Sequence, residues 1–384
     1  MQALACPPMP TRRTTRGAER TALSGDYDVL VCGASFAGLA VARELSGSGA
    51  RVMVVDRYEI GERQTSACGI PTEWLRAMGL TGAHRQTFGR LVVHTPFGTS
   101  VLELPWTFST FDYPALCELL WAQSDADFET AKVNGRTGSV VHTDRGDVSA
   151  GLIVDGLGWR RVLGSGANVQ PPEAALSRGL EVHPSGRGSD LELWLDTRYI
   201  SPGYGWSFPA RDELRIGVGS FDPLLHVKQP TLQLADDVAA EAVRFQGNWI
   251  PHRLRDAVDD GVFFVGDSAG HCLPLTAEGI RTALYFGIAC GRELAAVLDG
   301  RQTVELALRR YADFSASHRF QFECMYAAQQ SVRRLHGRPM DGLVRLFGRR
   351  RVSHWAFRHY LDIAPPMAAL PAPGLRSADI AAAA

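Results

Sequence analysis

The sequence has no excess of charge of either sign. Its 384 residues include 40 Lys and Arg against 41 Asp and Glu, a formal net charge of −1. Proteins that bind nucleic acid through its phosphates need a surplus of basic side chains, so we expect no nucleic-acid partner. A hydrophobic fraction of 45% with 21% charged residues is typical of a globular protein.

Paired cysteines and long apolar runs are also missing. No two cysteines form a CxxC motif, so the sequence predicts neither a metal site nor a disulfide framework and favours a reducing, cytoplasmic setting. The seven are Cys6, Cys32, Cys68, Cys117, Cys272, Cys290 and Cys324. No segment approaches the roughly 18 consecutive apolar residues of a spanning helix, which predicts a soluble or peripheral protein.

The first 25 residues are polar and rich in arginine and proline. They lack the apolar stretch of a signal peptide, and we predict a disordered leader over residues 1–25.

A strand–loop–helix pattern follows the leader. An apolar run over Asp28–Cys32 precedes a glycine loop, a helical stretch over Phe36–Leu45 and a second strand over Arg51–Val55. In such a unit the glycines let the backbone approach a pyrophosphate, and an acidic residue after the second strand binds a ribose hydroxyl. The pattern predicts a dinucleotide site formed by Gly33, Ser35, Phe36, Ala37, Gly38, Asp56 and Arg57.

The segment Gly261–Ile280 resembles the second FAD fingerprint of flavoprotein hydroxylases and reductases. The resemblance places Asp267 on the ribityl chain and the backbone N–H groups of the turn before the next helix against the flavin ring. A helix N-terminus there would stabilise the negative charge of reduced flavin. The cofactor residues predicted here are Gly266, Asp267, Pro274, Ala277, Glu278, Gly279 and Ile280. Ala277 stands where the family commonly has glycine.

The same segment supports an alternative. Gly266-Asp267-Ser268-Ala269-Gly270 also fits the GxSxG turn that carries the nucleophile of hydrolases. That hypothesis leaves the glycine loop at Gly33 unexplained.

A third motif, Tyr204-Gly-Trp-Ser-Phe-Pro209 followed by Gly217-Val-Gly219, resembles a signature of the geranylgeranyl reductase family. Aromatic rings on a sheet suit a long hydrocarbon, and we assign Tyr204, Trp206 and Phe208 to the substrate, with Trp106 as a weaker candidate. The alternative is that Trp206 and Phe208 are core residues.

Cys68-Gly69 matches a Cys-Gly of the same family close to the flavin. The resemblance makes Cys68 the candidate catalytic residue, where a thiol could shield the flavin, steer the substrate or relay a proton. The resemblance to the Asp-Gly segment of flavin hydroxylases is only partial: Asp155-Gly156 is present, but Trp159 and Val162 replace the usual Ser and Arg. Direct use of NAD(P)H is therefore open, and another reductant could serve.

The predicted fold class is α/β, with a Rossmann-like FAD-binding domain, an inserted antiparallel substrate domain and a C-terminal helical segment. Hairpin signals in the middle of the chain indicate the antiparallel sheet. The predicted boundaries are residues 26–85, 110–165 and 256–300 for the FAD-binding domain, 86–109 and 175–255 for the substrate domain, and 301–384 for the C-terminal segment and tail.

These resemblances imply an FAD-dependent oxidoreductase that reduces a carbon–carbon double bond in an isoprenoid-like, apolar or lipid-like substrate. The alternatives are a flavin monooxygenase of the p-hydroxybenzoate hydroxylase type and a non-redox FAD-dependent cyclase. The oligomeric state is not predicted.

Arginines alternate with apolar residues near the end of the chain, between Leu343 and Leu361. A basic amphipathic helix can rest on an anionic membrane. We therefore expect a cytoplasmic protein with peripheral membrane contact as an option, the alternative being a solvated helix on its own core.

Overall fold

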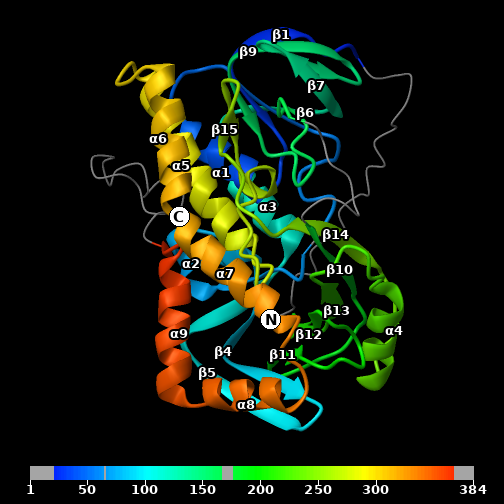
Figure 1. Ribbon diagram of the computed structural model, residues 1–384. Helices are drawn as coiled ribbons and strands as arrows, with labels where there is room; N and C mark the ends of the chain where they lie inside the picture. The colour runs from blue at the N-terminus through cyan, green and yellow to red at the C-terminus, as the bar shows by residue number, and fades with distance from the viewer. Residues whose placement is uncertain (1–20, 65, 167–175, 367–384) are drawn as a thin grey trace, which may run out of the picture.

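The computed structural model describes residues 21–64, 66–166 and 176–366 (Figure 1). Most of the predicted leader, residues 1–20, and the end of the predicted tail, residues 367–384, lie outside the described residues. The described part of residues 21–25 includes Leu23, which is buried, and the start of the first strand.

The first sheet is largely parallel and holds the predicted βαβ unit. Its strand order is β15-β16-β9-β1-β2-β6, and the β7–β8 hairpin extends it beyond β9. The pairs from β16 through β9, β1 and β2 to β6 are all parallel. The strands are β1 (Gly25–Cys32), β2 (Val52–Asp56), β6 (Asp127–Thr130), β7 (Val133–Thr137), β8 (Val140–Thr143), β9 (Gly146–Asp155), β15 (Val258–Asp259) and β16 (Val262–Phe264).

The second sheet is antiparallel except for one pair. Its order is β14-β10-β13-β12-β11-β4-β5-β3, and β11 runs parallel to β4. The strands are β3 (Gly69–Pro71), β4 (His84–Thr95), β5 (Gly98–Phe111), β10 (Leu176–Val182), β11 (Leu191–Trp194), β12 (Gly203–Pro209), β13 (Leu214–Ser220) and β14 (Gln246–Pro251).

Helices cover both sheets (Figure 1). Helix α4 packs on one face of the second sheet, where Leu234 joins Val182, Ile216 and Val218 in a buried cluster. The helices are α1 (Phe36–Leu45), α2 (Thr72–Ala77), α3 (Tyr113–Trp121), α4 (Lys228–Asp237), α5 (Ile280–Leu298), α6 (Val304–Ser317), α7 (Arg319–Val332), α8 (Arg338–Phe347) and α9 (Arg350–Asp362), with short 3-10 turns η1 (Thr81–Ala83) and η2 (Gly266–Ala269). Among these described helices, none combines the length and hydrophobicity needed to cross a bilayer.

The α/β fold class with a parallel sheet, an antiparallel sheet and C-terminal helices is confirmed. The hairpin over residues 140–154 forms β8 and β9, which belong to the first sheet and not to the antiparallel one. The reason is that β9 is long enough to pair with β8 at its start and to run parallel to β1 along its length. Helix α4 was not predicted, because Pro230 lies within this short segment of ten residues. Pro230 is in the first turn of the helix, where proline is tolerated.

Candidate active site

The glycine loop joins β1 to α1 in a tight turn. Gly33 has a φ of +112°, and a Cβ atom there would lie 2.3 Å from the carbonyl oxygen of Gly156. A Cβ atom at Gly38 would lie 1.9 Å from the carbonyl oxygen of Gly33. Both positions therefore require glycine for steric reasons. Ser35 lies at the N-cap of α1, but its side chain does not cap the helix, so the first N–H groups of α1 remain available to an anion.

Asp56 ends β2 and is held against this loop. Its two carboxylate oxygens accept hydrogen bonds from the N–H groups of Ala34 (2.8 Å) and Tyr58 (3.0 Å). Burial raises the pKa of Asp56, although these backbone bonds oppose the shift. Each oxygen keeps a further lone pair for a hydroxyl donor, which fits a ribose. Arg57 is exposed, and its guanidinium lies over the ring of Tyr58.

The second motif lies beside the first because α5 packs directly on α1. Gly266 and Asp267 lie in η2, and Gly279 is the N-cap of α5. A carboxylate oxygen of Asp267 would lie 3.6 Å from a Cβ atom at Gly279. Within the described part of the chain this carboxylate has no hydrogen-bond partner, and burial raises its pKa to about 6 despite the charge of Arg255. An unpaired acceptor at this place suits the hydroxyls of a ribityl chain.

The turn before α5 has an unusual backbone. Ala277 has a φ of +51°, a conformation that favours glycine. Pro274 is buried, whereas Ala277 and Glu278 are half-buried. Ile280 begins α5 and is buried.

Ser268 does not have the surroundings of a hydrolase nucleophile. It is fully buried, and its hydroxyl lies 2.7 Å from a carboxylate oxygen of Asp155 and 2.9 Å from the carbonyl oxygen of Gly158. The neighbouring His271 pairs with Ser315 instead. Ser268 therefore holds the end of β9, and among the described residues no histidine hydrogen-bonds to its hydroxyl as the base of a hydrolase would.

The aromatic motif lies on one face of β12. Tyr204, Trp206 and Phe208 are half-buried, whereas the residues that alternate with them are buried. The alternating residues face α4, since a Cβ atom at Gly205 would meet Leu234. The three rings therefore lie on the face of the sheet opposite α4. They are outside the buried cluster that α4 covers, which argues against the alternative that Trp206 and Phe208 are core residues.

Two contacts show where this aromatic face points. The hydroxyl of Tyr204 donates to the carbonyl oxygen of Thr276 (2.7 Å), in the turn before α5. Arg215, which is in register with Phe208, donates to the carbonyl oxygens of Ala67 (2.9 Å) and Cys68 (3.4 Å). Trp206 thus lies on a face that is tied to the second FAD motif on one side and to the Cys68 loop on the other.

Trp206 is held by features that the sequence did not reveal. Its indole N–H donates to Glu181 (3.3 Å), which also pairs with His183 (2.8 Å). A Cβ atom at Gly217 would lie 2.2 Å from the indole ring, because the ring of Trp206 occupies the space over this glycine. The sequence contains Gly217 in the motif but does not name the side chain that packs against it.

Cys68 is buried with a φ of +55°. Its thiol lies 3.1 Å from the carbonyl oxygen of Ser66, and burial raises the pKa of the thiol well above its ordinary value. Cys68 is therefore a neutral thiol at neutral pH.

Trp106 lies against the C-terminal segment. Its ring contacts Phe357 of α9 edge-on, and its N–H points to the carbonyl oxygen of Phe357 (3.4 Å). Its assignment to the substrate stays a prediction.

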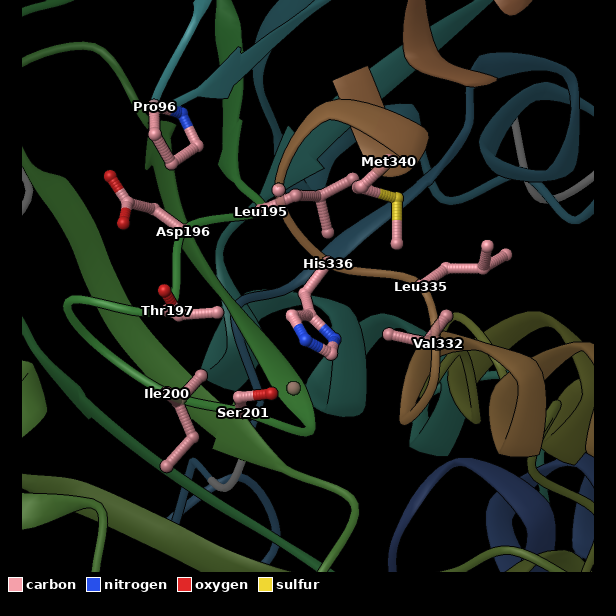
Figure 2. Close-up of a pocket in the computed structure, with 12 residues that line it drawn as sticks. Pro96, Leu195, Asp196, Thr197, Ile200, Ser201, Val332, Leu335, His336 and Met340 are labelled. Carbon is pink, nitrogen blue, oxygen red and sulfur yellow. The ribbon is translucent and has the colours of Figure 1, made fainter. Parts of the chain in front are cut away.

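Two of the pockets that the described residues form contain none of the predicted site residues in their walls. Figure 2 shows the first, where His336 from the α7–α8 connection and Ser201 from the β11–β12 connection both line the space. The second, of about 220 Å³, lies between Gln64 in the chain after β2 and Phe245 beside β14.

Comparison with known proteins agrees with this arrangement. Residues 26–100 match a family model described as an FAD binding domain. Digeranylgeranylglycerophospholipid reductase 3 of Methanosphaera stadtmanae is 27% identical over 341 residues, which cover 76% of this chain and 83% of that protein. The chain is an FAD-dependent oxidoreductase related to the geranylgeranyl reductases. Its cofactor is FAD.

Solved structures show that this flavoprotein shares its fold with two groups of enzymes. A geranylgeranyl bacteriochlorophyll reductase-like protein of Thermoplasma acidophilum has a TM-score of 0.78 at 16% identity and covers 90% of this chain and 98% of its own. PqsL of Pseudomonas aeruginosa, described as a probable FAD-dependent monooxygenase, has a TM-score of 0.63 at 18% identity. It covers 88% of this chain and 100% of its own. At such identities the likeness establishes the fold alone.

Proposed function

We propose that this flavoprotein reduces a carbon–carbon double bond of an isoprenoid-like, lipid-bearing substrate. The observation that carries the proposal is the half-buried aromatic face of Tyr204, Trp206 and Phe208, which is tied to the second FAD motif and to the Cys68 loop. Such a face offers a large apolar contact area with few polar groups to desolvate. The named reductase from Methanosphaera stadtmanae supports the same reaction class.

The chain's own residues would bind and orient both reactants. The N-terminus of α1 and Asp56 hold the nucleotide half of FAD, while Asp267 and the turn Pro274–Gly279 hold the ribityl chain and ring. When bound and reduced, by NAD(P)H or another donor, FAD supplies a hydride. The parallel sheet with its helices serves as the FAD-binding domain and the antiparallel sheet as the substrate domain.

Cys68 would act as a neutral thiol. Its raised pKa argues against thiolate chemistry, whereas a protonated thiol can steer an apolar chain or pass on a proton that water supplies.

Product mass after anaerobic turnover tests the proposal. The purified holoenzyme is reduced without oxygen and given a geranylgeranylated ether lipid. We expect a gain of two hydrogens for each double bond reduced. A gain of one oxygen in air, with no anaerobic product, would instead establish the monooxygenase alternative, and an unchanged mass with altered retention would indicate a cyclase.

We further propose peripheral membrane contact through α8 and α9. Leu343, Leu346 and Trp355 are exposed there, beside exposed arginines at 338, 345, 349, 350, 351 and 358. Phe357, in contrast, packs on Trp106, so only part of the predicted apolar set is free. Exposed apolar and basic side chains together favour an anionic membrane surface.

A further inference from the structure

The first turn of α5 contains a fully buried arginine. Arg281 has 0% of its surface exposed. Its five N–H donors have five acceptors: the two carboxylate oxygens of Glu278 (2.8 and 3.0 Å) and the carbonyl oxygens of Tyr360 (3.2 Å), Leu361 (2.9 Å) and Ala364 (3.0 Å). A guanidinium has five such donors in a planar fork, so each of them is satisfied.

The two halves of this fork bind different parts of the chain. One half binds the carboxylate of Glu278, which directly precedes Gly279 at the start of α5. The other half binds carbonyl groups at and beyond the C-terminal end of α9, where a cation also complements the negative end of the helix dipole. Arg281 therefore joins the turn before α5 to a helix about 80 residues further along the chain.

Tyr360 strengthens the same junction. Its hydroxyl donates to Glu278 and lies 2.9 Å from the hydroxyl of Thr276, while its ring lies beside the guanidinium of Arg281 at 4.8 Å. Both Thr276 and Glu278 belong to the turn that we assign to the flavin ring. The helix α9 thus contacts this turn at two positions.

The turn needs such support because its backbone is strained. Ala277, between Thr276 and Glu278, adopts a positive φ, which is unfavourable for a residue with a Cβ atom. Gln329 of α7 also stabilises the turn, because its side-chain amide donates to the carbonyl oxygen of Pro274 (2.7 Å). A conformation of this kind persists only where its surroundings determine it.

We propose that Arg281, Glu278 and Tyr360 are positioning residues for the flavin, and that they make the end of α9 a working part of the cofactor site. A buried ion pair gives little net stability compared with apolar packing. The planar guanidinium of Arg281, however, binds both carboxylate oxygens of Glu278 and so fixes the orientation of that side chain. The proposal rests on FAD binding at this turn and is independent of the substrate. Because coupling between sites is reciprocal, FAD must stabilise the end of α9 as much as α9 favours FAD binding.

Hydrogen exchange and cofactor affinity together test this coupling. The full chain is stripped of FAD and compared with the reconstituted holoprotein, following the amides of α9 by mass spectrometry. We expect FAD to slow exchange in the last turn of α9 about tenfold. We expect Arg281→Lys, which keeps the charge but loses the fork, to raise the dissociation constant of FAD about tenfold, and Tyr360→Phe to raise it severalfold.

A control separates positioning from general destabilisation. Thr303→Ala removes the N-cap of α6, which lowers stability without touching the turn, and it should leave FAD affinity unchanged. The proposal is overturned if FAD leaves exchange in α9 unchanged, or if Tyr360→Phe folds and binds FAD as the unaltered protein does. A chain that binds no FAD at all would overturn the reductase proposal too, whereas normal FAD binding without coupling would refute this proposal alone.

Discussion

At the scale of single residues, the indole ring of Trp206 occupies the space above Gly217. An added Cβ atom there would overlap the ring at 2.2 Å, so Gly217→Ala must displace it from the aromatic face. We expect kcat/KM for the alkene to fall about ten- to a hundredfold while FAD binding is retained. Gly89→Ala in β4 is the matched control, because no atom lies within 4 Å of its added Cβ.

Steady-state kinetics and flavin titration distinguish the outcomes. Equal activity of Gly217→Ala and Gly89→Ala would mean that Trp206 does not contact the substrate.

Asp267 gives a prediction about pH. Burial raises its pKa to about 6 in the apoprotein, above its value in the unfolded chain, so the folded state favours the protonated form. The resulting stability is fully present below about pH 4 and is lost as the pH rises through 6. Relative to Asp267→Asn, the unaltered apoprotein should therefore lose up to about 3 kcal/mol between pH 4 and pH 7. Urea unfolding of both proteins across this range checks the result, and parallel curves would show that folding does not shift the pKa of Asp267.

At the scale of elements, the contact between α1 and α5 brings the two FAD motifs together. Gly287 of α5 faces α1 so closely that a Cβ atom would lie 2.6 Å from the carbonyl oxygen of Ala37. At Gly291, one turn further on, a Cβ atom would lie 2.6 Å from the Cβ atom of Glu44. The glycines thus set the distance between the loop at Gly33 and the turn at Gly279.

Gly287→Ala should push these helices apart. We expect a loss of about 1–3 kcal/mol in the free energy of unfolding and weaker FAD binding, measured by denaturation and flavin fluorescence. Gly342→Ala in α8 is the control: its added Cβ meets no atom within 4 Å, and it should be neutral or stabilising by up to about 1 kcal/mol. Unchanged FAD affinity in Gly287→Ala would separate helix spacing from cofactor binding.

At the scale of the whole molecule, the basic helices lie at one end. Figure 1 shows α8 beside the β4–β5 hairpin, with α6 toward the opposite end. Sedimentation with phosphatidylglycerol vesicles should carry the protein down, and salt should release it. Since each arginine near such a surface contributes about 1 kcal/mol, Arg350→Gln with Arg351→Gln should weaken binding about thirtyfold.

A second arginine pair supplies the control for this effect. Arg309 and Arg310 are adjacent and exposed on α6, and replacing both with Gln changes the net charge equally. A similar loss of binding in both double variants would show that total charge, and not the surface of α8 and α9, drives the association.

The sequence alone determined the cofactor and much of the fold. The positive φ of Gly33 and the contact of Gly38 with the carbonyl oxygen of Gly33 are local requirements for glycine, and alternation along Tyr204–Phe208 places three rings on one face whatever lies beyond it. Local spacing of this kind survives in the sequence because it depends on neighbours a few residues apart. The placement of the four predicted substrate rings and of Cys68 relative to FAD stays a prediction.

Only the tertiary structure decided which distant residues complete the site. Arg281 lies at the start of an ordinary helix in the sequence, yet three of its five acceptors lie about 80 residues away, at the end of α9. Arg215 reaches the Cys68 loop across 147 positions, and Glu181 meets Trp206 through strand register. Such contacts depend on how two sheets and a C-terminal helix pack together, and no periodicity within one segment records that packing.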